Sequence, residues 1–493
     1  MKRLDRICDE YSGDSAESKL ALLAQFERRR LRSAREVHRL HELLSFLHAY
    51  PDDRRVRVQV EKLLGEFSER SDLRRFAVAL ADTGIAGTMT RYSFGWNMAR
   101  WLETKWPGRL SIDWDVFENG AELWGLLYAL LPFTESLVLD EADLDIQNLL
   151  EHLKTPGESD VGFVIRRVSQ SLGDAETREI VYEGLDIHCI LSSGKDTPSR
   201  TGAHYGPSVV TFQQKPLDRT RPDVKNASAV SPLAVRSLSA REGRKVIDMA
   251  RAAMVARSRD LYAFERASEH DVRLVDFEDG LQFAAIGLRP ASRLMLDTVY
   301  GFLTLKNGVP IGYALTRSYA DSTEIAYNIF DTFRGGESAH IYGRVLAMTR
   351  HLFGATVFAV EPYQLGHDNE EGLESGAWWF YYKLGFRPLD PGVKKLLQKE
   401  LARMRRSPRH RSSHDTLNRL SSEYMYLFLA RSRRDIRGAI SLGNIGLAVS
   451  EYLGQRFGAD RDRAMRLCER EAARLLGVRT FRGFSQDERM TWQ

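Results

Sequence analysis

Five short apolar runs between residues 271 and 330 constrain the fold of this chain more than any other feature. They read DVRLVDF, LQFAAIGL, YGFLTLK, VPIGYALT and TEIAYNIF, and their β-branched and aromatic content is typical of β-strands. The turn sequences Glu278-Asp279-Gly280 and Asn307-Gly308 join two pairs of these runs, and such turns favour tight antiparallel hairpins. The sequence therefore predicts an antiparallel sheet in the middle of the chain.

The residues after the fifth run alternate between helical and strand patterns. The stretch FRGGESAHIYG begins at Phe333 and leads into a helix that extends to Phe353, and the next run, ATVFAVEP, predicts a strand. A polar loop, YQLGHDNEEGLE, separates that strand from a short aromatic helix, SGAWWFYYKL, which ends before Gly385 as a helix with a C′ glycine does. This order predicts an α+β or α/β fold in which helices flank a mixed sheet.

The chain divides into three regions by sequence pattern. Residues 1–180 are mainly helical in pattern, and residues 15–50 form one long helix or two. Residues 181–395 begin with two strand-like runs, LDIHCILSSG and SVVTFQQKPL, and continue through a polar loop and a helix capped by Ser239 into the sheet. Residues 396–493 return to a helical pattern and form an extension.

Composition and charge limit the class of protein. The 493 residues are enough for two or three domains, and 43% of them are hydrophobic. The net charge of +4 gives no reason to expect a nucleic-acid-binding or membrane-surface protein, although the basic run RMRRSPRHR is either a solvated linker or a nucleic-acid contact. The three cysteines lie far apart and form no CxxC motif, so we expect neither a disulfide framework nor a metal site.

The apolar runs of the chain bear on targeting and membrane insertion. The N-terminus has no apolar signal segment, and the longest apolar run, LWGLLYALLPF, is too short to span a bilayer. We therefore expect a soluble cytoplasmic protein with no membrane partner.

Three motifs between about residues 300 and 388 resemble one known family. NGVPIGYALT carries a glycine turn into a strand with Gly-Tyr, FRGGESA opens a helix, and AWWFYYKLGFRP joins an aromatic helix to a strand. In this order they resemble the core of the GNAT superfamily of N-acyltransferases, over less than a quarter of the chain. The resemblance implies a GNAT-like mixed sheet, an acetyl-CoA or other acyl-CoA donor, no metal, and direct acyl transfer to an amine of a small molecule or peptide.

The resemblance assigns the acyl-CoA pyrophosphate to the loop that opens the helix, where backbone N–H groups and the helix dipole favour an anion. Glu337 stands where the family has its middle glycine. Its side chain either blocks the diphosphate or points outward as an acidic residue of the first turn, and we expect the outward orientation. The candidate cofactor-binding residues are Arg334, Gly335, Gly336, Ser338 and Ala339.

Acyl transfer to an amine needs a base for the amine proton and an acid for the departing thiolate. The resemblance makes Tyr381 the acid; alternatively, Tyr381 is one aromatic residue of a packed stripe. Glu324 and Glu361 are the candidate bases, or else solvated acids at strand ends. Glu374 replaces an asparagine that contacts pantetheine in relatives, and the acidic residues of 368–374 would attract a cationic amine.

These residues support two hypotheses. In the first, the protein is an acyl-CoA-dependent N-acyltransferase. In the second, it is a non-catalytic GNAT-fold module that senses acyl-CoA or acts as a scaffold, and its helical flanks bind a protein partner. His188 and Cys189 are neighbours in a strand-like run, so we expect a core pair rather than a nucleophile with its base. The loop SRTGAHYG, residues 199–206, is either an anion-binding loop or a simple turn.

Overall fold

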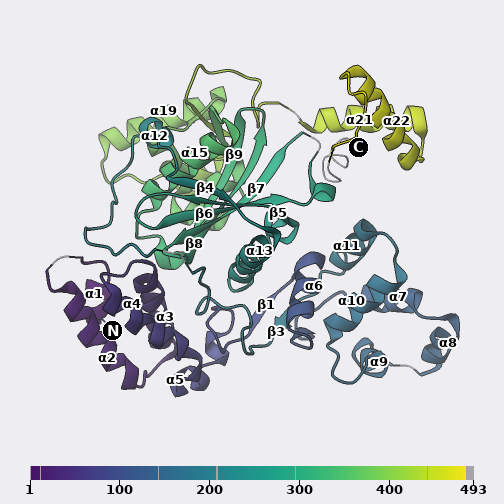
Figure 1. Cartoon of the computed structure of the whole chain (residues 1–493), viewed down its shortest axis with the longest axis horizontal. Helices are drawn as coiled ribbons and strands as arrows, with labels where there is room; N and C mark the ends of the chain where they lie inside the picture. The colour runs from purple at the N-terminus through teal and green to yellow at the C-terminus, as the bar shows by residue number, and fades with distance from the viewer. Residues whose placement is uncertain are drawn as a thin grey trace.

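The protein has a mixed α+β fold with one large sheet, one small sheet and many helices (Figure 1). The computed structural model describes residues 2–11, 13–142, 144–206, 209–294, 296–440 and 442–484. The end of the third region, residues 485–493, lies outside the described residues.

The large sheet has nine strands in the order β11-β12-β10-β9-β8-β7-β6-β5-β4. β9 and β10 are parallel, and every other neighbouring pair is antiparallel. The strands are β4 Ala234–Ser237, β5 Ala267–Asp276, β6 Leu281–Leu288, β7 Thr298–Lys306, β8 Val309–Tyr319, β9 Ser322–Ile329, β10 Val357–Val360, β11 Arg387–Pro388 and β12 Met425–Phe428.

The predicted strands and hairpins are confirmed. The runs between residues 271 and 330 form β5 to β9, and each pairs with its neighbour in sequence. Asp279 and Gly280 have φ angles of 57° and 71°, and Asn307 and Gly308 have φ angles of 50° and 82°. Two successive left-handed residues are what a tight hairpin turn requires, which is why Asp-Gly and Asn-Gly signalled these turns.

The unit β9–α15–β10 contains the parallel strand pair. Helix α15, Ser338–Phe353, follows β9 and ends at Gly354, whose φ of 67° suits the left-handed cap position. Because β10 then lies beside β9 in the same direction, the loop before α15 opens at the end of β9.

Strand β12 was not predicted. The sequence pattern assigned everything after about residue 393 to helix, and α19 (Pro391–Arg406) and α20 (His414–Leu420) fit that prediction. Met425–Phe428 instead inserts between β10 and β11, antiparallel to both. A short apolar run cannot be told from a piece of buried helix by periodicity alone, and its partners lie far back in the chain.

The N-terminal region is mainly helical, as predicted. Residues 15–50 form two helices, because Ser33 caps a new helix with a hydrogen bond from the Glu36 backbone N–H. The helices are α1 Lys2–Ile7, α2 Ser15–Arg28, α3 Ala34–Ala49, α4 Arg54–Gly65, α5 Ser71–Arg75, α6 Trp96–Lys105, α7 Gly120–Leu130, α8 Phe133–Ala142, α9 Ile146–Leu153, α10 Asp160–Ser171 and α11 Ala175–Glu183.

A three-stranded sheet accompanies these helices. It has the order β1-β3-β2, with β1 Thr90–Tyr92, β2 Leu110–Ile112 and β3 Cys189–Leu191. The run LDIHCILSSG thus contributes a strand, which pairs with two strands of the N-terminal region and not with the large sheet.

The run SVVTFQQKPL was predicted as a strand, and this prediction is wrong for its described part, residues 209–217. The backbone N–H of Gln213 donates to the Pro51 carbonyl, 2.8 Å away, so this extended segment bonds to the chain after α3 instead of joining a sheet.

Helices cover both faces of the large sheet. On β9, Tyr327 packs on Tyr342 of α15, with ring centroids 5.1 Å apart. On β8, Tyr313 packs on Phe264 of α14 (Tyr262–Glu265), which follows α13 (Ala240–Val255). Tyr313 lies opposite Asn328, and Asn328 and Tyr327 point to opposite faces because they are consecutive in the strand. Helices α14 and α15 therefore lie on opposite faces.

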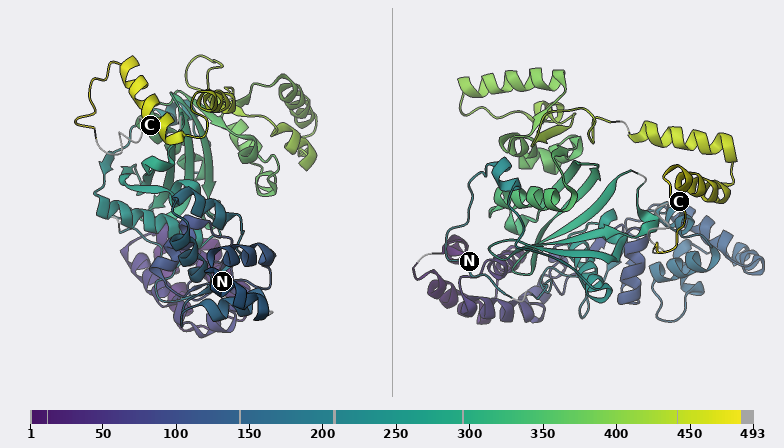
Figure 2. Two further views of the ribbon diagram at one scale, coloured as in Figure 1. Left: turned by 90° about the vertical axis from the view of Figure 1, so that its right-hand side faces the viewer. Right: turned by 45° about the horizontal axis from the view of Figure 1, so that its top comes forward.

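The remaining helices lie before, between and after the strands of the large sheet in sequence. Figure 2 shows α21 and α22 standing away from the sheet, at the yellow end of the chain, and none of the residues of α21 is buried. These helices are α12 Val224–Ser228, α16 Pro362–Leu365, α17 Glu370–Ser375, α18 Ala377–Lys383, α21 Leu442–Phe457 and α22 Arg461–Leu475.

Candidate functional site

A cavity of about 310 Å³ opens at the end of β9, beside the start of α15. Three of the residues predicted from the sequence, Arg334, Ser338 and Tyr381, line it together. They come from the loop before α15, the first residue of α15 and helix α18. Glu371, one of the acidic residues of 368–374, also lines it, and residues that the sequence did not single out complete the lining, among them Arg259, Tyr313, Asn328 and Gln364.

The loop before α15 is a tight 3₁₀ turn, Asp331–Phe333, followed by two glycines. The Gly336 N–H donates to the Phe333 carbonyl at 3.0 Å, and the Ser338 hydroxyl donates to the Arg334 carbonyl at 3.1 Å. Among the described residues, no side chain caps the first turn of α15. The N–H groups at this helix end are therefore available to an anion.

The two glycines are not required by backbone conformation. Neither has a positive φ, and a Cβ on Gly335 would meet no atom within 4 Å. The Gly335 carbonyl accepts a hydrogen bond from Arg219 at 2.9 Å, and both residues line a different hollow, beside α3. Gly335, Gly336 and Ala339 are not among the described residues that line the cavity, and Ala339 packs against the core instead.

Glu337 does not point outward, so that expectation is wrong. Its side chain is buried, and its Oε2 lies 3.1 Å from the ammonium of buried Lys306 at the end of β7. The Asp218 backbone N–H donates to the other carboxylate oxygen at 3.4 Å. The unlike charge of Lys306 holds the carboxylate under the loop, an attraction across 31 residues of sequence that no local pattern signals.

Arg334 already binds a carboxylate. Its guanidinium contacts Glu371 of α17 and lies 3.0 Å from Asp331 Oδ1. Arg259 approaches the other Glu371 oxygen at 3.5 Å. Burial opposes the charged form of Glu371, but the hydrogen bond from Arg334 and the charge of Arg259 outweigh it and lower the pKa of Glu371. An ionised carboxylate thus occupies the position between two arginines that line the cavity.

Tyr381 is buried at 2% exposure, and its ring meets Tyr342 and Phe386 edge to face. Burial raises the pKa of the Tyr381 hydroxyl, so this group keeps its proton at neutral pH. Its neighbour Tyr382 instead stacks on Trp378, with ring centroids 5.4 Å apart, and is not among the described residues that line the cavity. Of this adjacent pair, Tyr381 is therefore the one that can present a hydroxyl proton to the cavity.

Glu324 lies outside the cavity, in a buried polar cluster on the face of β9 that also carries Asn328. Tyr424 donates its hydroxyl proton to Glu324 Oε2 at 3.0 Å, and Arg437 Nε lies 3.2 Å from the same oxygen. Arg437 also lies 3.0 Å from Asp297, which Arg317 approaches at 3.2 Å. Glu324 therefore forms an ion pair with Arg437 and accepts a hydrogen bond from Tyr424. The alternative prediction of a solvated acid at a strand end is wrong for Glu324.

Glu361 interacts electrostatically with both Glu324 and Tyr381. It is the residue before α16, and burial, followed by the charge of Glu324, raises its pKa. The Glu361 charge in turn helps to raise the pKa of Tyr381. Neither Glu361 nor Glu324 is among the described residues that line the cavity, and of the two only Glu361 acts on Tyr381.

Tyr424 and Arg437 were missed by the sequence interpretation. Both flank β12, in a region assigned to helix, and the run MYLFLA was the signal that a strand lay there. Arg259 was missed because it lies in the connection after α13, and only the fold brings it to the cavity.

The other sequence candidates have simpler places. Cys189 is fully buried in β3, but His188 is exposed just before that strand, so the expectation of a core pair is wrong for His188. Within the described ranges, no group of three or more His, Cys, Asp or Glu side chains is arranged to hold a metal ion. Over the same part of the chain, no helix combines the length and apolar character needed to cross a bilayer.

Comparison of the chain with protein-family models, with curated proteins and with solved structures gives no match.

Proposed function

We propose that this protein is an acyl-CoA-dependent N-acyltransferase of the GNAT type, which transfers an acyl group to an amine of a small molecule or peptide. The observation that carries the proposal is the meeting of Arg334, Ser338 and Tyr381 at one cavity. These residues were selected from two separate motifs, and they come together at the end of the parallel pair β9/β10.

The chemistry follows from the groups around the cavity. The amine nitrogen attacks the thioester carbonyl carbon, the C–S bond breaks, and the thiolate takes the Tyr381 proton. The proton lost by the amine goes to a carboxylate, for which Glu361 is the better placed candidate and Glu324 the second. A raised Glu361 pKa makes that carboxylate a stronger base for this step.

The donor would bind through its diphosphate at the start of α15. Arg334 and Arg259 supply positive charge there, and the uncapped N–H groups of the first turn supply donors. A diphosphate would have to displace the Glu371 carboxylate from both arginines, which exchanges one anion for another with more charge. The Glu337 carboxylate is no obstacle, because its charge is compensated by Lys306.

A second candidate function is a non-catalytic module with the same fold. Two observations favour it: Glu371 already fills the space between the arginines, and Arg437 already binds Glu324. In that case helices α21 and α22, which stand away from the sheet, would contact a protein partner. Three free cysteines suit a reducing compartment, so we place either function in the cytoplasm.

The two candidates are separated by one experiment. The full chain is incubated with acetyl-CoA and with longer acyl-CoAs and a panel of amines, and release of the CoA thiol is followed, while calorimetry measures CoA binding. An enzyme releases thiol only when donor and acceptor are both present. CoA binding without amine-dependent release supports the sensing module, and absence of both rejects acyl-CoA as a ligand.

A further inference from the structure

A small cavity of about 10 Å³ lies beside the turn that precedes Arg334. Its polar lining comes from four separate segments: Ser45 of α3, Arg200 of the loop 199–206, Arg257 after α13, and Thr332 before α15. A cavity needs roughly 10–15 Å³ to hold one water molecule. The space therefore admits a single water or a monoatomic ion and excludes phosphate, sulfate and carboxylates.

Two hydrogen-bond donors of this lining have no partner. Ser45 is 7% exposed, and its hydroxyl is buried without a hydrogen-bond partner among the described residues. The Arg200 Nε–H group is also buried and has no hydrogen-bond partner among the described residues. The Arg200 nitrogen can only donate, and the serine hydroxyl can donate, so the missing group is an acceptor.

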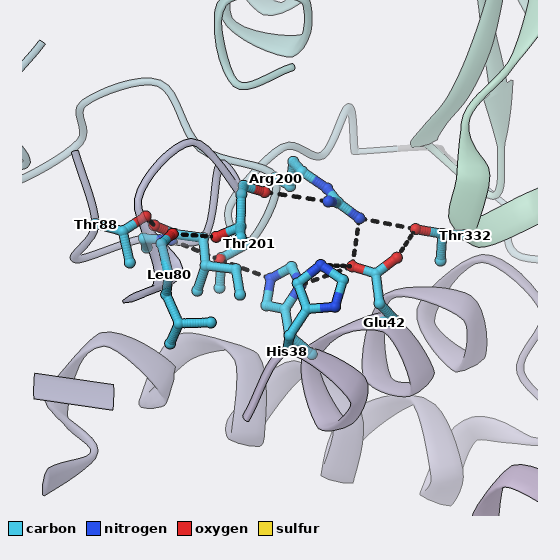
Figure 3. Close-up of polar contacts among 11 residues, drawn as sticks. His38, Glu42, Leu80, Thr88, Arg200, Thr201 and Thr332 are labelled. Atoms are coloured by element: carbon cyan, nitrogen blue, oxygen red, sulfur yellow. Dashed lines mark hydrogen bonds and ion pairs between the residues drawn. The ribbon is translucent and has the colours of Figure 1, made fainter. Parts of the chain in front are cut away.

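The two terminal nitrogens of Arg200 have hydrogen-bond partners. Figure 3 shows its guanidinium beside the Glu42 carboxylate and the Thr332 hydroxyl. Thr332 donates its proton to Glu42, and Arg200 also donates to the Thr83 carbonyl at 3.1 Å. Burial opposes the charge of Glu42, but hydrogen bonding to His41 and the charge of Arg200 outweigh it and lower the pKa of Glu42. Glu42 is therefore ionised, and its charge balances that of Arg200.

Arg257 brings a second positive charge. It donates to the Ala253 carbonyl at 2.8 Å, and its guanidinium lies 3.6 Å from the centre of the Phe330 ring. Among the described residues, no carboxylate lies within ion-pair distance of it. Glu42 and then Asp331 act on it from further away, and Asp331 is 82% exposed and screened by water. Two partly buried guanidinium groups thus face the single carboxylate of Glu42, and one positive charge remains in excess.

We propose that this cavity binds a single chloride ion, which accepts hydrogen bonds from the Arg200 Nε–H and the Ser45 hydroxyl and balances the charge of Arg257. A water molecule would satisfy the donors but would leave the charge uncompensated. The bound ion would join α3, the loop 199–206 and the end of α13 to the turn before Arg334. In this proposal, the loop SRTGAHYG binds the chloride ion through the side chain of Arg200. This inference does not depend on the acyltransferase proposal.

The test compares halides with an anion too large to enter. The full-length protein is dialysed into sodium gluconate, and its Tm is measured while chloride or bromide replaces gluconate at constant ionic strength. We expect Tm to rise by several degrees and then to saturate, as binding at one site does. In crystals grown from sodium bromide, we expect an anomalous bromine peak between Ser45 and Arg200.

Two variants locate the effect. Ser45→Ala removes one donor and should raise at least severalfold the chloride concentration at which half of the Tm increase is reached. Ser421→Ala removes another buried serine hydroxyl, just after α20, and should leave that concentration unchanged. Arg257→Met should abolish the chloride dependence of Tm. Identical Tm values in gluconate and chloride, or a bromide-grown crystal without a bromine peak in the cavity, would overturn the proposal. If Arg257→Met does not fold, the Ser45→Ala midpoint and the bromide crystal still decide it.

Discussion

The Lys306 ammonium lies 3.1 Å from the Glu337 carboxylate, and both side chains are buried beneath the loop that opens α15. The Lys306 ammonium also lies 5.0 Å from the centre of the ring of Tyr50, the C-cap residue of α3. One ion pair therefore connects the large sheet, the N-terminal helices and the proposed cofactor loop.

Breaking this ion pair should destabilise the protein strongly. Glu337→Gln leaves the buried Lys306 charge without its partner, and such changes cost about 3–5 kcal/mol. The double variant Glu337→Gln with Lys306→Met removes both charges and should recover most of that loss. Chemical denaturation of the wild type, both single variants and the double variant measures the coupling. Additive losses in the double variant would show that the two charges act independently.

Tyr381→Phe should lower turnover by about a hundredfold to ten-thousandfold, because it removes the proposed acid while keeping the ring that fills the core. CoA affinity and Tm should stay close to those of the wild type. Tyr382→Phe is the matched control, since Tyr382 is the adjacent residue and stacks on Trp378 outside the cavity. Equal turnover in the two variants would assign Tyr381 to the core alone.

Glu371→Gln should tighten CoA binding. The substitution keeps the size of the side chain and removes the charge that competes with a diphosphate for Arg334 and Arg259. Partly exposed ion pairs are worth about 0–1 kcal/mol, so the gain in affinity should be at most about fivefold. Calorimetric titration with CoA measures it. The neighbour Glu370 lies on the same helix, and Glu370→Gln should leave the affinity unchanged; equal affinities for wild type and Glu371→Gln would place the diphosphate elsewhere.

Glu265→Gln should stabilise the protein at alkaline pH relative to the wild type. Burial, followed by the charges of Asp260 and Glu183, raises the pKa of Glu265 to about 8. Between pH 4.5, the ordinary pKa, and about pH 8, Glu265 is protonated in the folded protein and ionised in the unfolded chain. The free energy of unfolding of the wild type therefore falls as pH rises through that window. Within the window, the free energy of unfolding of the wild type should fall relative to that of the variant by about 1.4 kcal/mol for each tenfold drop in proton concentration.

The measurement is the free energy of unfolding of wild type and Glu265→Gln between pH 4.5 and 9. The advantage of the variant should grow as pH rises. Glu118→Gln provides the control, because it makes the same chemical change at an exposed position. A pH-independent difference for Glu265→Gln would show that Glu265 is ionised in the folded protein.

The sequence by itself determined the elements whose signals are local. The hairpins of β5 to β9 follow from Asp279-Gly280 and Asn307-Gly308, since few other residues adopt the left-handed turn conformation. The capping box of α13, in which Ser239 and Glu242 bond each other's backbone N–H groups, likewise announces its helix. Arg334, Ser338 and Tyr381 were selectable because they stand in short contiguous motifs.

Only the tertiary structure decided the charges and contacts around those residues. The inward Glu337, the carboxylate between Arg334 and Arg259, and the cluster around Glu324 depend on partners tens to hundreds of residues away. Strand β12 joins the sheet for the same reason, because its pairing with β10 exists only once the chain has folded back. Local propensity acts over a few residues, whereas burial and ion pairing act between any residues that the fold brings together.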